Sequence, residues 1–225
     1  MKSTAILASV VACAIVGLTG CGGGGHDDNP TPVFTAQVFS DPGTDGDIEQ
    51  VGSNSFTITQ GMSSSVQSVL SGIDPASGNE FRAFLDFPLD GSTGYDTVPG
   101  NAVIKSATLE IVIDDLQPPN TSLPLLIDLV STLPRLTLVA ADYDRSALPA
   151  LASVQTSVRE ADVTHSVFVD VTALMVQAQR LGLADFQIRI LEDLVPNPVD
   201  TLIAIDNTTG ANRSKFAPLL TVEYF

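Results

Sequence analysis

The sequence predicts an all-β fold: a two-sheet antiparallel β-sandwich of the jelly-roll type with one short helix. After residue 33, apolar residues recur at every second position, which gives each strand one apolar face and one polar face. Clusters of Gly, Pro, Asp and Asn separate these stretches, as in residues 41–46 and 90–94. Many short strands with a single helical stretch favour a sandwich.

The clearest strand is residues 107–114, where odd positions are apolar and Thr108, Glu110 and Asp114 are expected to face water. The same alternation predicts strands at residues 81–87, 166–171, 186–190 and 220–224. Less regular stretches predict further strands at residues 34–39, 55–59, 123–130, 136–140 and 200–205.

One helix is predicted after the strand at residues 166–171. Thr172 is a suitable N-cap, Leu174, Ala178 and Leu181 form an apolar stripe, and Gly182 suits a left-handed stop. Because the helix is short and lies between two strands, we expect it to close one end of the sandwich.

The first residues are typical of a secretory signal. Lys2 precedes an apolar stretch at residues 5–18, which is shorter than the roughly 20 residues that cross a bilayer. The motif Leu-Thr-Gly-Cys, ending at Cys21, resembles a bacterial lipobox, which implies cleavage after residue 20 and acylation of Cys21. We therefore expect a signal at residues 1–20, a lipidated Cys and flexible tether at residues 21–32, and one domain at residues 33–225. Gly22 favours the outer over the inner membrane.

Charge and cysteine content exclude several classes of function. The chain has 26 acidic and 10 basic residues, so its surface repels phosphate backbones and nucleic-acid binding is not expected. Of the two Cys, one leaves with the signal and Cys21 is consumed by lipid, which leaves no disulfide and no thiol nucleophile. There is no Gly-x-Ser-x-Gly motif, and His165 is the one His of the expected domain. We therefore do not expect an enzyme.

Four stretches resemble the bacterial DNRLRE-domain proteins, a group related to jelly-roll carbohydrate-binding modules. They are residues 82–87, residues 103–109, the junction at residues 168–172, and the closing turn and strand at residues 210–224. Their order and spacing agree over residues 34–225. The resemblance implies a jelly roll that associates with extracellular polysaccharide or the cell surface, without an established catalytic site. This chain lacks the Trp residues that such domains often carry.

Candidate ligand-binding residues are two Tyr–Asp pairs in predicted loops. Sugar recognition combines an aromatic platform with polar groups. Tyr95 with Asp96, and Tyr143 with Asp142, are the candidates; packing of each Tyr within its loop is the alternative.

A second candidate site is acidic. Asp41, Asp45, Asp47 and Glu49 follow one another in a Gly-rich stretch and offer the hard oxygen ligands that Ca²⁺ prefers. Their spacing does not match an EF-hand, and turn-forming Asp residues explain the same pattern. No cofactor is expected, with a structural Ca²⁺ at these residues as the one alternative.

These observations lead to a functional hypothesis. The chain is expected to be a membrane-anchored, non-catalytic surface module that binds polysaccharide or extracellular matrix. The alternative is a structural or assembly lipoprotein that docks another protein of the cell envelope.

Overall fold

The computed structural model of the chain describes residues 31–61, 67–94, 96–132, 134–193 and 198–225. The chain divides into two units, residues 1–31 and residues 32–225, and the second unit contains the elements described below. The expected signal at residues 1–20, Cys21 and most of the expected tether lie outside the described residues.

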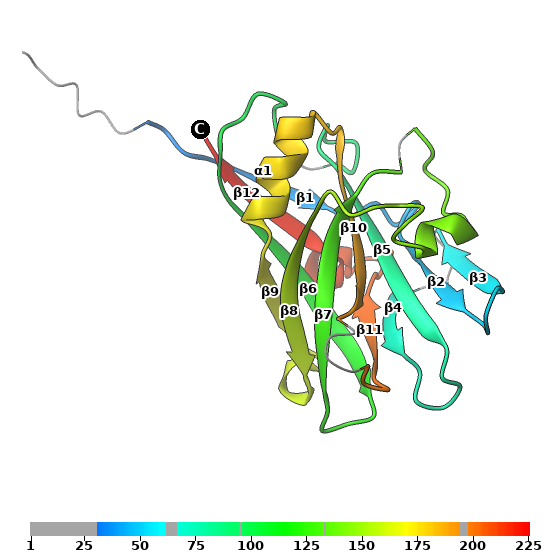
Figure 1. Cartoon of the computed structure of the whole chain (residues 1–225). Coiled ribbons are helices and arrows are strands. Elements are labelled where there is room, and N and C mark those ends of the chain that lie inside the picture. The colour runs from blue at the N-terminus through cyan, green and yellow to red at the C-terminus, as the bar shows by residue number, and fades with distance from the viewer. Residues whose placement is uncertain (1–30, 62–66, 95, 133, 194–197) are drawn as a thin grey trace, which may run out of the picture. The chain divides into compact units, whose positions relative to one another are not determined.

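The second unit is built on β-strands, so the predicted all-β class is confirmed. Within the described ranges, twelve strands form a curled antiparallel sheet, as Figure 1 shows. The strands are β1 (Phe34–Phe39), β2 (Gly46–Gln50), β3 (Phe56–Gln60), β4 (Ser68–Ile73), β5 (Glu80–Pro88), β6 (Ile104–Gln117), β7 (Ser122–Val130), β8 (Ala152–Arg159), β9 (Ser166–Asp170), β10 (Asp185–Glu192), β11 (Leu202–Asp206) and β12 (Leu219–Tyr224). The helices are α1 (Thr172–Leu181) and the single turn α2 (Arg213–Phe216), with 3₁₀ turns η1 (Ala140–Tyr143) and η2 (Glu160–Asp162).

The sheet curls because its longest strand changes partners along its length. The strand order is β1-β12-β6-β11-β4-β5-β10-β7-β8, with β9 beside β6, β2 beside β5 and β3 beside β2. The first part of β6 pairs with β12 and β9, and its last residues pair with β11 through a bulge. Strand β4 joins β5 only through Gly72 and Ile73.

The core follows the predicted alternation. In β6, Leu109, Ile111 and Ile113 are buried in the main apolar cluster, as expected for its odd positions. Helix α1 lies against β6, β7, β8 and β10, and its Leu174 and Ala178 join the same cluster, consistent with its expected place at one end of the curled sheet.

The structure agrees with the predicted end of α1 but not with its predicted N-cap residue. Gly182 has the expected left-handed conformation with φ 65°. Val171, however, occupies the N-cap position, and Thr172 Oγ1 instead accepts a hydrogen bond from the Ala107 amide at 2.9 Å. The Thr172 hydroxyl therefore joins the helix to β6. The Thr172 amide in turn donates a hydrogen bond to Asp170 Oδ1 at 2.9 Å.

Five sequence-based expectations on secondary structure are corrected. Residues 136–140 do not form a strand; they belong to a long connection between β7 and β8. Strands β2, β4 and β8 were not expected, and α2 joins the one expected helix. In β2, the stretch interpreted as an acidic loop pairs with β3 and β5.

Candidate functional site

The face of the sheet that points away from the main apolar cluster, which we call the outer face, carries a second, smaller apolar cluster. It consists of Ile48 of β2, Phe84 of β5, and Leu138 and Tyr143 of the β7–β8 connection, with Phe56 packed against it. We call residues 131–151, residue 133 aside, the covering segment. Its turn η1 contacts β3. Because this segment covers the outer face, the alternate residues of β5 that sequence patterning places in water are buried.

A buried ion pair connects the covering segment to the sheet. Arg189 of β10 and Asp128 of β7 are fully buried, and Arg189 Nη2 lies 2.8 Å from Asp128 Oδ2. Arg189 Nη1 also donates to the backbone carbonyl of Asp142 at 3.0 Å. Arg145 lies 3.0 Å from the same Asp128 carboxylate, and Ser153 Oγ donates to it at 2.6 Å. Burial lowers the pKa of Arg189, and the Asp128 contact opposes that shift.

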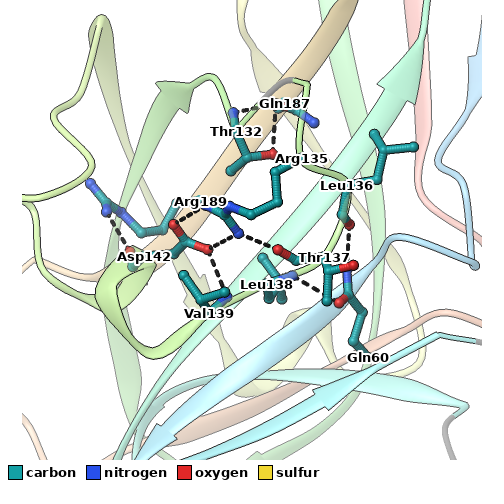
Figure 2. A network of polar contacts seen from close by, with 10 residues as sticks. All are labelled: Gln60, Thr132, Arg135, Leu136, Thr137, Leu138, Val139, Asp142, Gln187 and Arg189. Carbon is teal, nitrogen blue, oxygen red and sulfur yellow. Dashed lines mark hydrogen bonds and ion pairs between the residues drawn. The ribbon is translucent and has the colours of Figure 1, made fainter.

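Asp142 organises the covering segment from within. Arg135 donates to both carboxylate oxygens of Asp142, at 2.9 and 2.6 Å, which is the two-pronged geometry that guanidinium favours. The Val139 amide donates to the same carboxylate at 2.8 Å. Figure 2 shows these contacts together with the Arg189 bond to the Asp142 carbonyl. The hydrogen bonds to Asp142 raise the pKa of Arg135.

Tyr143 is an interior residue. Its side chain and backbone are 6% exposed, its hydroxyl donates to Gln50 Oε1 at 2.8 Å, and the Arg82 guanidinium lies 3.8 Å from its ring centroid. Phe56 lies against the ring at a centroid distance of 5.1 Å. Burial raises the pKa of Tyr143. The ring therefore packs inside the protein and does not present a free face to solvent.

Two glutamines attach the first part of the covering segment. Gln60 of β3 donates to the Leu136 carbonyl at 3.0 Å and accepts from the Leu138 amide at 2.9 Å. Gln187 of β10 accepts from the amide and hydroxyl of Thr132, at 2.8 and 3.2 Å. The backbone groups in this part of the covering segment thus hydrogen-bond to side chains of the sheet and not to a neighbouring strand (Figure 2).

A small pocket lies between this part of the segment and the outer face of the sheet. Its free volume is about 20 Å³, which is room for roughly one water-sized group. The wall is mixed in polarity, and its residues are Thr44, Phe84, Leu85, Asp86, Val130, Thr132, Leu136, Leu138, Gln187 and Ile188.

Asp86 is the titratable group of the pocket. It is 5% exposed, and its Oδ1 atom has no hydrogen-bond partner among the described residues. Burial, with a contribution from the charge of Asp185, raises the pKa of Asp86 to about 6, although hydrogen bonds from Gln187 and Thr44 oppose this shift. The pocket therefore places one buried carboxyl group beside apolar side chains.

The structure does not bring the expected sugar-binding pairs together in one place. Asp96 hydrogen-bonds both backbone groups of Gln37, at 3.0 Å through its carboxylate and 3.3 Å through its amide, and so covers an edge of β1. Tyr95 lies outside the described residues. Asp142 and Tyr143 instead contact β10, β5 and β2.

The expected calcium ligands each have a different protein partner. Asp41 accepts from the Gly43 amide at 2.8 Å, Asp45 from the Asp86 amide at 2.9 Å, Asp47 from the Leu70 amide at 3.2 Å, and Glu49 from the Asn79 side chain at 2.7 Å. Burial raises the pKa of Asp45 well above its ordinary value and that of Asp47 to about 7. Among the described residues, no group of three or more His, Cys, Asp and Glu side chains is arranged to hold a metal ion.

Sequence reasoning missed the residues that build the pocket and its support. Asp86, Asp128, Gln187 and Arg189 alternate with core residues, so patterning assigns them to a solvated face. A signal was nevertheless present, because Arg189 and Asp128 place opposite charges in otherwise apolar strands. Such residues are almost never buried unless they are paired.

The chain matches no protein-family model and no curated protein. Within the described part of the chain, no helix combines the length and the apolar character needed to cross a membrane. The contacts of the pocket therefore form the basis for a functional interpretation.

Proposed function

We propose that this protein is a lipid-anchored, non-catalytic module that binds polysaccharide or extracellular matrix through the pocket at Asp86. The main observation in favour is that the Asp86 carboxyl group, whose Oδ1 atom has no hydrogen-bond partner among the described residues, lines a pocket together with Phe84, Leu136 and Leu138. An acceptor next to apolar surface is the combination that a sugar requires, since a sugar presents hydroxyl donors and C–H faces together.

The size of the pocket defines how a glycan binds. A free volume of about 20 Å³ admits one hydroxyl group and not a whole ring. The rest of the glycan therefore lies on the covering segment, where Leu136 is half exposed. The contact recognises a protruding group on a long polymer, and a surface module gains affinity by repeating such contacts along the polymer.

The fold we infer is a two-layer jelly roll. One layer is β3-β2-β5-β10-β7-β8 and the other is β1-β12-β6-β11-β4, with β9 at the side of β6. The limited pairing of β4 with β5 and the change of partners along β6 support two layers joined at a corner. The four stretches that resemble DNRLRE domains support the same arrangement.

The anchor we propose is acylated Cys21, exposed by cleavage after residue 20, with the outer membrane as its location. The sequence Leu-Thr-Gly-Cys and the Gly-rich residues 22–25 support this. Several acyl chains on one residue hold a protein stably at a membrane, whereas a single chain does not.

The test uses the mature lipid-free chain on a glycan array, with Ca²⁺ and then with a chelator, followed by titration of the strongest ligand. Asp86→Ala should weaken binding about tenfold, as expected for the loss of one hydrogen bond to a charged group. Asp170→Ala, an exposed carboxylate of β9, is the matched control and should bind like wild type. A melting curve shows that each variant is folded.

Two results would overturn the proposal. One is equal glycan binding by the wild type and Asp86→Ala, which would remove the pocket from the function. The other is the absence of any bound glycan together with specific cross-linking to one envelope protein, which would favour the structural lipoprotein. Binding that survives the chelator would argue against Ca²⁺ in recognition.

A further inference from the structure

The ends of three neighbouring strands form an exposed apolar projection where the chain enters the domain. Its members are Val33 and Phe34 at the start of β1, Val103 before β6 and Phe225 after β12, with exposed fractions of 43%, 53%, 64% and 44%. We call these four residues the apolar tip. Large apolar side chains gathered at one place mark interaction sites more often than isolated ones do.

Backbone pairing holds the tip in shape. Phe34 pairs with Tyr224, and their rings stack at a centroid distance of 5.8 Å. Val103 and Phe225 exchange both backbone hydrogen bonds, at 3.0 and 3.4 Å. The tip is therefore a continuation of the sheet rather than a set of unrelated loop residues.

The two faces of the tip are both apolar. Successive residues of a strand point to opposite faces, so Val33 and Phe34 lie on different faces, as do Tyr224 and Phe225. A single protein partner covers one face of a sheet, whereas a fluid apolar medium surrounds both. This arrangement favours a bilayer as the occupant.

The position of the tip in the chain points to the same partner. Residues 21–32 connect Cys21 directly to Val33, and even fully extended they span roughly 40 Å. The tip is thus the part of the domain that comes first along the chain from the proposed lipid anchor. Lys105 and Glu223, directly behind the tip, form an ion pair at 3.0 Å, so these two side chains add no net charge there.

We propose that the apolar tip inserts into the bilayer that holds Cys21, at the boundary between headgroups and acyl chains. This inference rests on the proposed anchor at Cys21. Insertion is shallow because the polar pair Lys105–Glu223 follows the tip, which is consistent with the ~5–10 Å depth of interfacial segments. The tip then acts as a second attachment that fixes how the domain stands on the membrane.

The absence of tryptophan from the chain permits a direct test. Phe34→Trp places the sole Trp in the tip. Phe168→Trp places it in β9, at a side chain that is 65% exposed, the highest fraction for a large apolar residue in the described part of the chain. Phe168 pairs with Glu110, further along β6 from the tip. Both variants are prepared as the full lipidated protein and incorporated into phosphatidylethanolamine–phosphatidylcholine vesicles, with and without lipids brominated on the acyl chain.

Flotation of the vesicles is measured first, and Trp emission second. We expect both variants to float, with blue-shifted emission and strong quenching by brominated lipid for Phe34→Trp and neither effect for Phe168→Trp. Flotation with equal, weak quenching of both variants would overturn the inference and leave the anchor intact. A protein that stays at the bottom of the gradient would refute the anchor, and with it the attachment of the tip.

Discussion

Replacing Arg189 with methionine removes the positive charge that joins β10 to β7 and to the covering segment. The substitution keeps an apolar stem of similar length and leaves Asp128 fully buried. Removal of one partner from a buried ion pair costs about 3–5 kcal/mol, because the other charge stays buried. Arg145 and Ser153 still contact Asp128 in this variant, so we expect the lower end, about 3 kcal/mol.

The assay is urea unfolding of the mature chain, followed by far-ultraviolet circular dichroism. The matched control is Lys105→Met, which breaks the Lys105–Glu223 pair, whose side chains are 45% and 39% exposed. An exposed pair contributes little to stability because solvent screens it, so this variant should unfold close to wild type. Hydrogen exchange of residues 136–148 should also accelerate in Arg189→Met, since the Asp142 carbonyl loses its donor.

The reasoning is refuted if Arg189→Met and Lys105→Met lose the same stability. A second comparison separates the ion pair from packing. Exchange of both partners for apolar residues, Arg189→Met with Asp128→Leu, leaves no uncompensated charge and should cost less than Arg189→Met alone.

Two further predictions concern the sheet. Burial raises the pKa of Asp47 to about 7, so the unfolded chain loses this proton first as the pH rises, and stability falls between about pH 4 and about pH 7. Asp47→Asn should remove up to about 4 kcal/mol of this pH-dependent loss of stability, measured by urea unfolding at several pH values. A pH dependence of stability equal to that of the wild type would contradict the raised pKa of Asp47. Gly72 has φ +111°, and a Cβ there would lie 2.2 Å from the Thr201 carbonyl oxygen. Gly72→Ala should therefore lower the melting temperature strongly, whereas Gly100→Ala, with no atom within 4 Å of its Cβ, should not; equal melting temperatures would contradict the steric argument.

Strands with one solvent-exposed face were predictable from the sequence. The bounds of β1 were predicted at residues 34–39, and the core positions Leu109, Ile111 and Ile113 of β6 followed from alternation alone. Strands β4 and β8 were missed because Ser, Gly, Thr and Gln occupy many of their positions, which weakens the apolar period. Residues 136–140 show the opposite error, since an apolar stretch is held by the Gln60 side chain instead of a neighbouring strand.

The candidate site was harder to predict for a physical reason. Alternation assigns Asp86 and Arg189 to the outer face, and it is correct about the face. It contains no information on the covering segment that removes this face from water, because that contact joins residues far apart in the sequence. For the same reason the partners of Asp142 and Tyr143, which were expected in a loop, could not be predicted: both are interior contacts of that segment.

The two proposed contacts lie toward opposite ends of β1, and this separation makes them compatible. Phe34 of the tip begins β1, whereas Phe39 ends it and leads to Asp41, whose amide donates to the Asp86 carbonyl at 2.7 Å. A strand of six residues is roughly 20 Å long. A domain attached at the tip therefore holds the region of Asp86 about that far along the strand from the tip, beyond the shallow depth of insertion. Glycan binding and membrane attachment then use separate surfaces, so loss of the tip should change the orientation of the protein without changing its affinity for a soluble glycan.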